Sequence, residues 1–436
     1  MLHYVWKHKL FPLKQMITTD GRSVEVINPG FHNTDAGPDF LDAKIKIEGI
    51  EWVGNVEIHL KASDWYLHHH NVNKTYDNVI LHVVEQSNCD VSYPDGTNIP
   101  QLIIPIPEHI KNNYETLVTL DYYPRCKKII GNISLLLVHN WLSALQIERL
   151  ELRTHQIKER LKQCEYDWEH TLFVTMARNF GFGINGDAFE SWAYTIPKHA
   201  INKHRNDLFQ IEAILFGQAG LLEDSAIPDV YKQNITQDDY YQRLKHEYNY
   251  LRHKFNLTHI NPHIWKFLRL HPQNFPHIRI AQIAMMWYEQ KSNFSKFIEA
   301  TSIAELRDLL DSHVSQYWKC HYTFASTKTP EIEKGLTNVS KDLIIINTIV
   351  PILFAYGKHK YKESLCERAI NLLEELKPEN NHFVREWAEA GIVCQSAADS
   401  QAIIQLTKQY CQPHECLRCR FGYEFIRHTP DFLKEK

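Results

Sequence analysis

The stretch "GPDFLDAKIKIEGIEWVGNVEIHLKASDW", residues 37–65, decides how the N-terminal part of this chain folds. It contains two runs in which polar and apolar residues alternate, at 40–47 and 51–61. Alternation with a period of two is typical of a strand with one apolar face. The residues "EGIE" at 48–51 separate the runs, so the sequence predicts an antiparallel hairpin that turns there.

Acidic residues and a histidine gather on the polar face of this hairpin. Alternation places Glu57, His59 and Lys61 together on that face. The expected turn pairs Asp42 of the first strand with Glu57, with side-chain bases about 5 Å apart, and Asp39 enters the first strand near His59. Neighbouring carboxylates repel each other unless a cation lies between them, so we expect Asp39, Asp42 and Glu57 to hold Mg²⁺ or Mn²⁺. The alternative is an ordinary half-buried sheet without a metal.

Histidines follow the hairpin closely. The segment "SDWYLHHHNVNKTYDNVILHVV" contains Asp64, three consecutive histidines at 68–70 and His82. Imidazole is a common metal ligand and a common general acid or base, so we expect Asp64, His68 and His70 to support the same site. A solvated loop is the alternative for the consecutive histidines. His82 lies inside an apolar run, which favours a buried histidine hydrogen-bonded to the backbone.

A second candidate site lies near the C-terminus. Cys411, Cys416 and Cys419 form a C-x4-C-x2-C pattern. Three thiolates and one further ligand would satisfy zinc or an iron–sulfur cluster, whereas a redox pair or unliganded thiols are the alternatives. Nearby candidates for the further ligand are Cys394, His414 and His428.

Length and composition limit the class of protein. With 436 residues, of which 44% are hydrophobic, the chain can bury large cores and is expected to form two or three domains. Its net charge of -4 gives no global positive field for nucleic acid, so nucleic-acid binding would need a local basic surface. The start "MLHYVWKHKLF" lacks the apolar run of a secretory signal, and the most apolar stretch, 343–357, is short for a membrane span. An odd number of scattered cysteines suits reduced thiols. We therefore expect a cytoplasmic protein that does not enter a membrane.

The pattern changes along the chain from short strands to helices. We expect an α+β fold with a mixed β-sheet domain at 1–125, a large irregular α-helical domain at 126–398, and a cysteine-containing tail at 399–436 packed on the helical domain. The small residues of "EAILFGQAGLL" at 212–222 favour close, buried helix packing. The basic and aromatic residues at 265–282 would either contact nucleic acid or pack between helices.

The hairpin resembles the PD-(D/E)xK nuclease superfamily, in which an acidic residue after a proline is followed by a strand hairpin, an acidic residue and a lysine. The matching residues are Pro38, Asp39 and Glu57, and His59 stands at the lysine position. The resemblance implies that the two acids hold magnesium while the basic residue orients a water molecule. Lys61 lies on the same face and is the alternative for that last role.

Two further resemblances involve both ends of the chain. Some PD-(D/E)xK nucleases of helicase complexes combine a late cysteine triplet with an earlier cysteine to hold an iron–sulfur cluster, and here Cys126 would be that earlier ligand. The stretches "NPGFHNTDAGPDF", "GNVEIHLKASDWYLHHH" and "CQPHECLRCRFGYEFI" resemble an uncharacterised bacterial family, a domain of unknown function that spans nearly the whole chain. That resemblance implies no activity.

Together these patterns lead us to expect a divalent-metal-dependent hydrolase, most specifically a nuclease-like phosphodiesterase acting on nucleic acid. Asp39 and Glu57 would hold the metal, and His59 or Lys61 would position the attacking water. The competing hypothesis is a non-catalytic helical scaffold or binding protein, in which the C-terminal cysteines hold a structural zinc ion or iron–sulfur cluster and the hairpin is only structural.

Overall fold

The structure is a computed structural model that describes residues 1–11, 16–120, 123–289 and 293–428. Contacts divide the chain into two compact units. The sheet unit consists of Met1–Val138, Glu386–Ile392 and Leu406–Lys436, and the helical unit consists of His139–Arg385 and Val393–Gln405. This grouping differs from the expected domain boundaries, because the C-terminal cysteine segment belongs with the sheet rather than with the helical domain.

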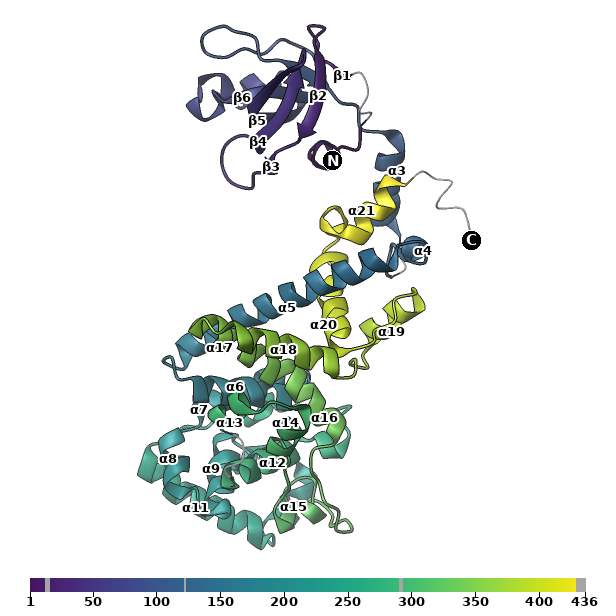
Figure 1. The fold of residues 1–436 in the computed structure, drawn as a ribbon. Helices are drawn as coiled ribbons and strands as arrows, with labels where there is room; N and C mark the ends of the chain where they lie inside the picture. Colours follow the sequence, from purple (N-terminus) through teal and green to yellow (C-terminus); the bar gives the residue numbers. More distant parts are fainter. Residues whose placement is uncertain (12–15, 121–122, 290–292, 429–436) are drawn as a thin grey trace. The chain divides into compact units, whose positions relative to one another are not determined.

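A seven-stranded mixed sheet forms the centre of the sheet unit (Figure 1), and with the helices that follow it confirms the α+β class. The strand order is β1-β2-β4-β5-β6-β7, and β3 pairs with β4. Strand β5 pairs antiparallel with β4 but parallel with β6, which in turn pairs parallel with β7. The strands are β1 (Met16–Ile17), β2 (Ser23–Asn28), β3 (Phe31–His32), β4 (Phe40–Ile47), β5 (Ile50–Lys61), β6 (Val79–Gln86) and β7 (Gln101–Ile103).

The β4–β5 hairpin is confirmed, but its turn is shorter than expected. Ile47 pairs with Ile50, so only Glu48 and Gly49 form the loop. Both have positive φ, 51° and 78°, as a two-residue loop between twisted strands requires. From Ala43 to Ile47 the register therefore differs by two residues from the expected one, which leaves these side chains on their expected faces, and it shifts again between Phe40 and Ala43.

Short helices complete the sheet unit. Asn113 on α3 is buried, and its Nδ2 donates to the carbonyl oxygens of Phe425, Ile426 and His428 at 3.3, 3.0 and 2.7 Å. It thereby satisfies backbone acceptors at the end of α21. The helices of this unit are α1 (Leu2–Lys7), α2 (Asp64–Leu67), α3 (Glu108–Thr119), α4 (Lys127–Ile130) and α21 (Arg420–Arg427), with shorter turns η1 (His70–Val72), η2 (Lys74–Tyr76), η8 (Thr407–Cys411) and η9 (Cys416–Arg418).

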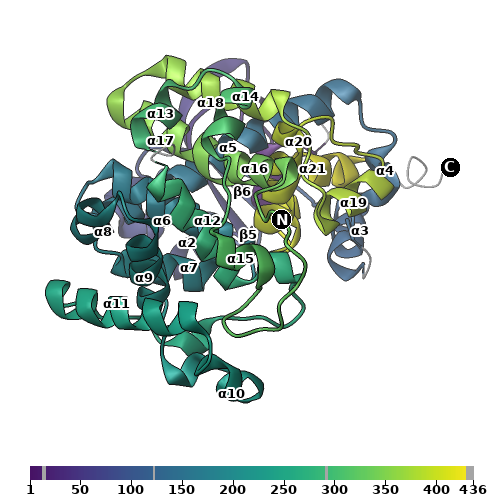
Figure 2. The ribbon, with the colours of Figure 1, turned by 90° about the horizontal axis from the view of Figure 1, so that it is seen from below.

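The helical unit packs around α9 (Leu208–Gln218), which contacts α11 (Asp239–Phe255) and α12 (Pro276–Tyr288) (Figure 2). A Cβ at Gly217 would lie 2.1 Å from the Tyr248 ring, so the small residues do permit close helix packing, as the sequence predicted. The other long helices are α5 (Leu135–Gln163), which begins in the sheet unit, α6 (Trp168–Phe180), α7 (Gly186–Thr195), α17 (Val350–Lys360), α18 (Glu363–Glu375), α19 (His382–Glu389), which ends in the sheet unit, and α20 (Ala397–Leu406). Shorter ones are α8 (Lys198–His204), α10 (Lys232–Ile235), α13 (Phe294–Glu299), α14 (Ile303–Leu309), α15 (Gln316–Cys320) and α16 (Asn338–Ile344).

Two segments singled out in the sequence lie in the core of the helical unit. The helical stretch Asn338–Lys360 is long and apolar enough to cross a bilayer, but 67% of its most apolar window is buried inside the protein, as in a core helix of a soluble protein. Within 265–282, Trp265 is buried and donates to the Ala219 carbonyl oxygen, and buried Arg279 donates to Asn274. Trp265 and Arg279 therefore pack between helices, whereas Lys266 and Arg269 of the same segment are exposed.

The buried carboxyl group of Glu212 on α9 leads us to predict that the stability of the helical unit depends on pH. Its carboxyl group is 1% exposed and accepts hydrogen bonds from Tyr240 and Ser315 at 2.6 and 2.8 Å. Burial raises the pKa of Glu212 from 4.5 to about 7. A carboxyl group whose pKa is higher in the folded state binds its proton more tightly there, so the stability it contributes is lost as the pH rises from 4.5 to 7.

We therefore expect Glu212→Gln to remove this loss. Between the two pKa values the wild type should lose roughly 1–3 kcal/mol in the free energy of unfolding relative to the variant. Urea denaturation of both proteins across this pH range measures the difference. Parallel stability curves would show that Glu212 titrates normally.

Candidate metal centre

Strand β5 carries two buried polar side chains. Its parallel neighbour β6 pairs His82 with Glu57 and Val84 with His59. From Val56 to His59 every residue is buried, with Glu57 and His59 only 4% and 8% exposed. Parallel strands are usually covered on both faces, so the polar face that the sequence predicted is enclosed here.

The carboxylate opposite Glu57 is not the one expected from the sequence. The pairing of β4 with β5 shifts between Phe40 and Ala43, where Asp42 adopts a positive φ of 54°. Asp42 is exposed, and its backbone N–H lies 3.4 Å from Asn55 Oδ1. The bulge therefore removes Asp42 from the site, which corrects its expected role as a metal ligand.

Asp39 takes the position beside Glu57. Its backbone N–H donates to Glu57 Oε2 at 3.1 Å, and its own Oδ2 accepts the backbone N–H of Ile58 at 3.0 Å. His3 on α1 completes the group, with Nε2 3.0 Å from the same Oδ2. The two acids are thus linked through backbone groups of each other's strands.

A turn after β5 brings the consecutive histidines back to the sheet. Helix α2 ends before His68, and His69 adopts the left-handed conformation with a φ of 59°. The turn directs His68 and His70, the two neighbours of His69, toward His59, although the chain is not extended there. His70 is buried and stacks on Tyr76, with ring centroids 3.8 Å apart.

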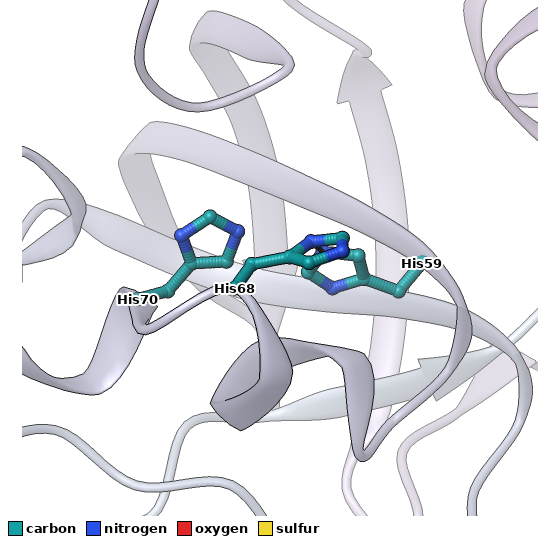
Figure 3. Close-up of side chains that lie close together, drawn as sticks. All are labelled: His59, His68 and His70. Atoms are coloured by element: carbon teal, nitrogen blue, oxygen red, sulfur yellow. Dashed lines mark hydrogen bonds between the residues drawn. The ribbon is translucent and has the colours of Figure 1, made fainter.

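Three imidazoles converge at this point (Figure 3), and the Glu57 carboxyl group lies beside two of them. The figure shows His59 reaching from the strand and His68 and His70 from the turn, and ligand atoms of these three residues all lie within 4.8 Å of one another. His59 Nε2 is 3.2 Å from His68 Nδ1 and 3.4 Å from Glu57 Oε1, which is itself 3.2 Å from His70 Nε2. Ligand atoms around a tetrahedral zinc ion are about 3.4 Å apart. These three separations therefore match edges of a metal coordination shell.

His82 lies behind this cluster and was not identified as part of it from the sequence. It is fully buried, and its Nε2 is 2.9 Å from His59 Nδ1 instead of being bonded to the backbone. If His59 donates through Nδ1, its Nε2 keeps a lone pair that faces His68 and Glu57. A second imidazole placed in this way orients a metal ligand. The only sequence signal was a histidine inside an apolar strand.

Burial favours the neutral form of the His59 and His70 imidazoles. Burial, followed by the neighbouring histidines, lowers the pKa of His59 and His70 to about 4. Burial and then the charge of Asp39 raise the pKa of Glu57 to about 8. Burial also raises the pKa of Asp39, but the effects of His3 and of the Ile58 N–H together exceed it, so that pKa lies below its usual value. Neutral imidazole is the form that binds metals.

The remaining predicted site residues lie outside the convergence. Lys61 is exposed, and its backbone N–H donates to Asp64 Oδ2 at 3.1 Å, so the Asp64 carboxylate binds the end of β5. The exposed Lys61 side chain follows an exposed Leu60 at the end of the strand. Cys411, Cys416 and Cys419 gather elsewhere in the sheet unit, around a separate cavity.

Comparison with known proteins gives a family but no activity. Residues 1–382 match the model of a family described as "Protein of unknown function (DUF2851)". No curated protein and no solved structure gave a significant match. The matched residues include the whole histidine cluster.

The histidine cluster leads to a prediction about metal binding. We expect the chelator-treated protein to bind about one Mn²⁺ there, and His68→Ala to weaken that binding about 10- to 100-fold because one ligand is lost. His69→Asn is the matched control, since its side chain is not part of the group and asparagine tolerates a positive φ. Loss of the free Mn²⁺ paramagnetic resonance signal measures binding, and Mn²⁺ avoids thiolates. Equal affinity in the wild type and His68→Ala would exclude the site.

Proposed function

We propose a function from the site itself, on the premise that the chain belongs to the family of proteins of unknown function DUF2851. The protein acts as a metal-dependent hydrolase of phosphodiesters, with the metal bound by His59, His68, His70 and Glu57. The convergence of the three imidazoles within 4.8 Å of one another carries the proposal, and Glu57 Oε1 lies beside two of them, 3.4 Å from His59 Nε2 and 3.2 Å from His70 Nε2.

The ligand chemistry favours zinc, manganese or iron over magnesium. Imidazole suits these borderline metals, whereas Mg²⁺ prefers oxygen ligands and retained waters. The nuclease superfamily resembled by the hairpin would need Asp39 and Glu57 to face one ion. Here Glu57 Oε2 and Asp39 Oδ2 each accept a backbone N–H, which favours the histidine set as the metal ligands.

The bound metal would lower the pKa of a water molecule and so supply hydroxide at neutral pH. His82 holds His59 in the tautomer that leaves Nε2 as a ligand. Asp39 orients His3, whose side chain is partly exposed and borders a cleft. An imidazole held by a carboxylate is suited to donate a proton to a leaving oxygen, so we assign His3 this role.

The cleft beside His3 supports an anionic substrate. It has a volume of about 860 Å³ and lies wholly within the sheet unit. Lys7 and Arg418 line it together with His3 and His32, and none of the described residues that line it is acidic. Phe31, 71% exposed, offers an aromatic face next to these cations. Cations beside an exposed ring suit the phosphates and bases of single-stranded nucleic acid.

The proposed reaction predicts that hydrolysis depends on the histidine cluster. With Mn²⁺ or Zn²⁺ added, we expect the wild type to cleave bis(p-nitrophenyl) phosphate or single-stranded nucleic acid. His68→Ala should lower the rate by about 100-fold or more, because the metal-bound nucleophile is lost. His69→Asn should retain the rate.

A competing outcome separates catalysis from a structural role. If Glu57 occupies the fourth position permanently, the ion is closed to water, as in structural zinc sites. The protein would then bind metal through the cluster and lose folding stability in His68→Ala, but the loaded wild type would cleave none of these substrates. That result would reject the hydrolase and favour a scaffold.

The cleft makes a prediction about salt dependence. Lys7→Ala should weaken binding of a short fluorescein-labelled single-stranded DNA, and should reduce the slope of log affinity against log salt by about 0.7, the value for one lost phosphate contact. Lys74→Ala is the control, because Lys74 is exposed on the same unit but does not line the cleft. Fluorescence anisotropy at several salt concentrations measures both slopes. Equal slopes in all three proteins would place the substrate elsewhere.

A further inference from the structure

Four cysteines from distant parts of the chain meet in the sheet unit. Cys126 precedes α4, Cys411 ends η8, Cys416 begins η9 and Cys419 precedes α21. All four line one cavity of about 20 Å³. The structure thus supplies a fourth sulfur to the C-terminal triplet from a residue almost three hundred positions earlier in the sequence. Cys394, a candidate from sequence proximity, belongs to the other unit.

The fold holds the two contributing segments together by means other than sulfur. Asn113 ties α3 to the end of α21 through its three carbonyl contacts. A Cβ on Gly422 would lie 2.2 Å from the Cys416 carbonyl oxygen, so α21 can fold back on the cysteine loop only because this residue is glycine. The loop carrying Cys416 is therefore set at a fixed distance from the helix that follows Cys419.

A positively charged side chain lies beside the four cysteines. Arg125 lines the same cavity, and its Nη1 donates to the Cys411 carbonyl oxygen at 3.4 Å. Metal-bound thiolates carry negative charge, so a neighbouring guanidinium is favourable at such a centre.

The spacing of the sulfurs distinguishes between metal groups. Around one tetrahedral zinc ion, sulfurs lie about 2.3 Å from the metal and therefore about 3.8 Å from one another. In the described part of the chain, ligand atoms all within 4.8 Å of one another occur in one place, the histidine cluster, and not among the cysteines.

We propose that Cys126, Cys411, Cys416 and Cys419 bind an iron–sulfur cluster that joins the segment around α4 to the C-terminal segment. Four cysteine thiolates are the usual ligand set of such clusters. This site is separate from the histidine cluster, so the proposal does not rest on the proposed hydrolase activity.

The test measures iron, acid-labile sulfide and zinc in the full-length protein, purified without oxygen and reconstituted with ferrous iron and sulfide. We expect iron and sulfide in about equal amounts, about four of each per chain for a cubane cluster, together with broad visible absorption. Cys126→Ser should lose most of the iron, sulfide and colour. Cys89→Ser is the matched control, because Cys89 belongs to the same unit but does not line the cavity, and it should keep them.

Three further observations make the result decisive. His68→Ala should keep the iron and sulfide, which separates this centre from the histidine cluster. Asn113→Ala weakens the contact between α3 and α21 without removing a sulfur. If the Asn113→Ala protein keeps its colour and the Cys126→Ser protein does not, the colour is lost because a ligand is missing and not because the protein misfolds. One zinc per chain without sulfide would overturn the cluster in favour of a single ion, and wild-type protein without either metal would overturn the site altogether.

Discussion

Parallel pairing of β5 with β6 is the constraint on which the candidate site depends. Up to Gly54, β5 belongs to an antiparallel hairpin whose outer residues meet solvent, but from Val56 to His59 every residue is buried. An antiparallel edge would leave Glu57 and His59 in water, where neither would need a partner. Enclosure forces their polar atoms to find partners inside the protein, and those available are other imidazoles and backbone N–H groups.

The sequence predicts the local elements of this site better than the pairing of its distant strands. Alternation correctly gives the hairpin, the α+β class and the shared face of Glu57 and His59. It cannot give the bulge that displaces Asp42, because a one-residue irregularity leaves no mark on hydrophobic periodicity. Periodicity also cannot show that His82 faces His59, since that contact depends on the register of two strands and joins residues 23 positions apart. Side-chain chemistry was visible in the sequence, whereas the pairing of distant strands was not.

The cysteine cavity and the cleft beside His3 share one short loop. Arg418 lies between Cys416 and Cys419 and also lines that cleft. A residue placed between two metal ligands has its backbone fixed by them, so the proposed cluster would set the position of a cation in the proposed substrate cleft. The cysteines would then affect substrate binding through the position of this loop.

The discontinuity of the sheet unit has a consequence for how the chain acquires its structure during synthesis. This unit begins at Met1 but includes Leu406–Lys436, and the whole helical unit is translated in between. At ribosomal rates of about 5–20 residues per second, the N-terminal strands wait between roughly ten seconds and one minute for α21. During that interval Asn113 on α3 lacks the carbonyl groups of α21 to which it donates. The Cys126 thiol, which is buried in the folded protein, is then exposed to water. Nascent chains that stop short of α21 are therefore natural clients of chaperones and proteases, however well their strands pair.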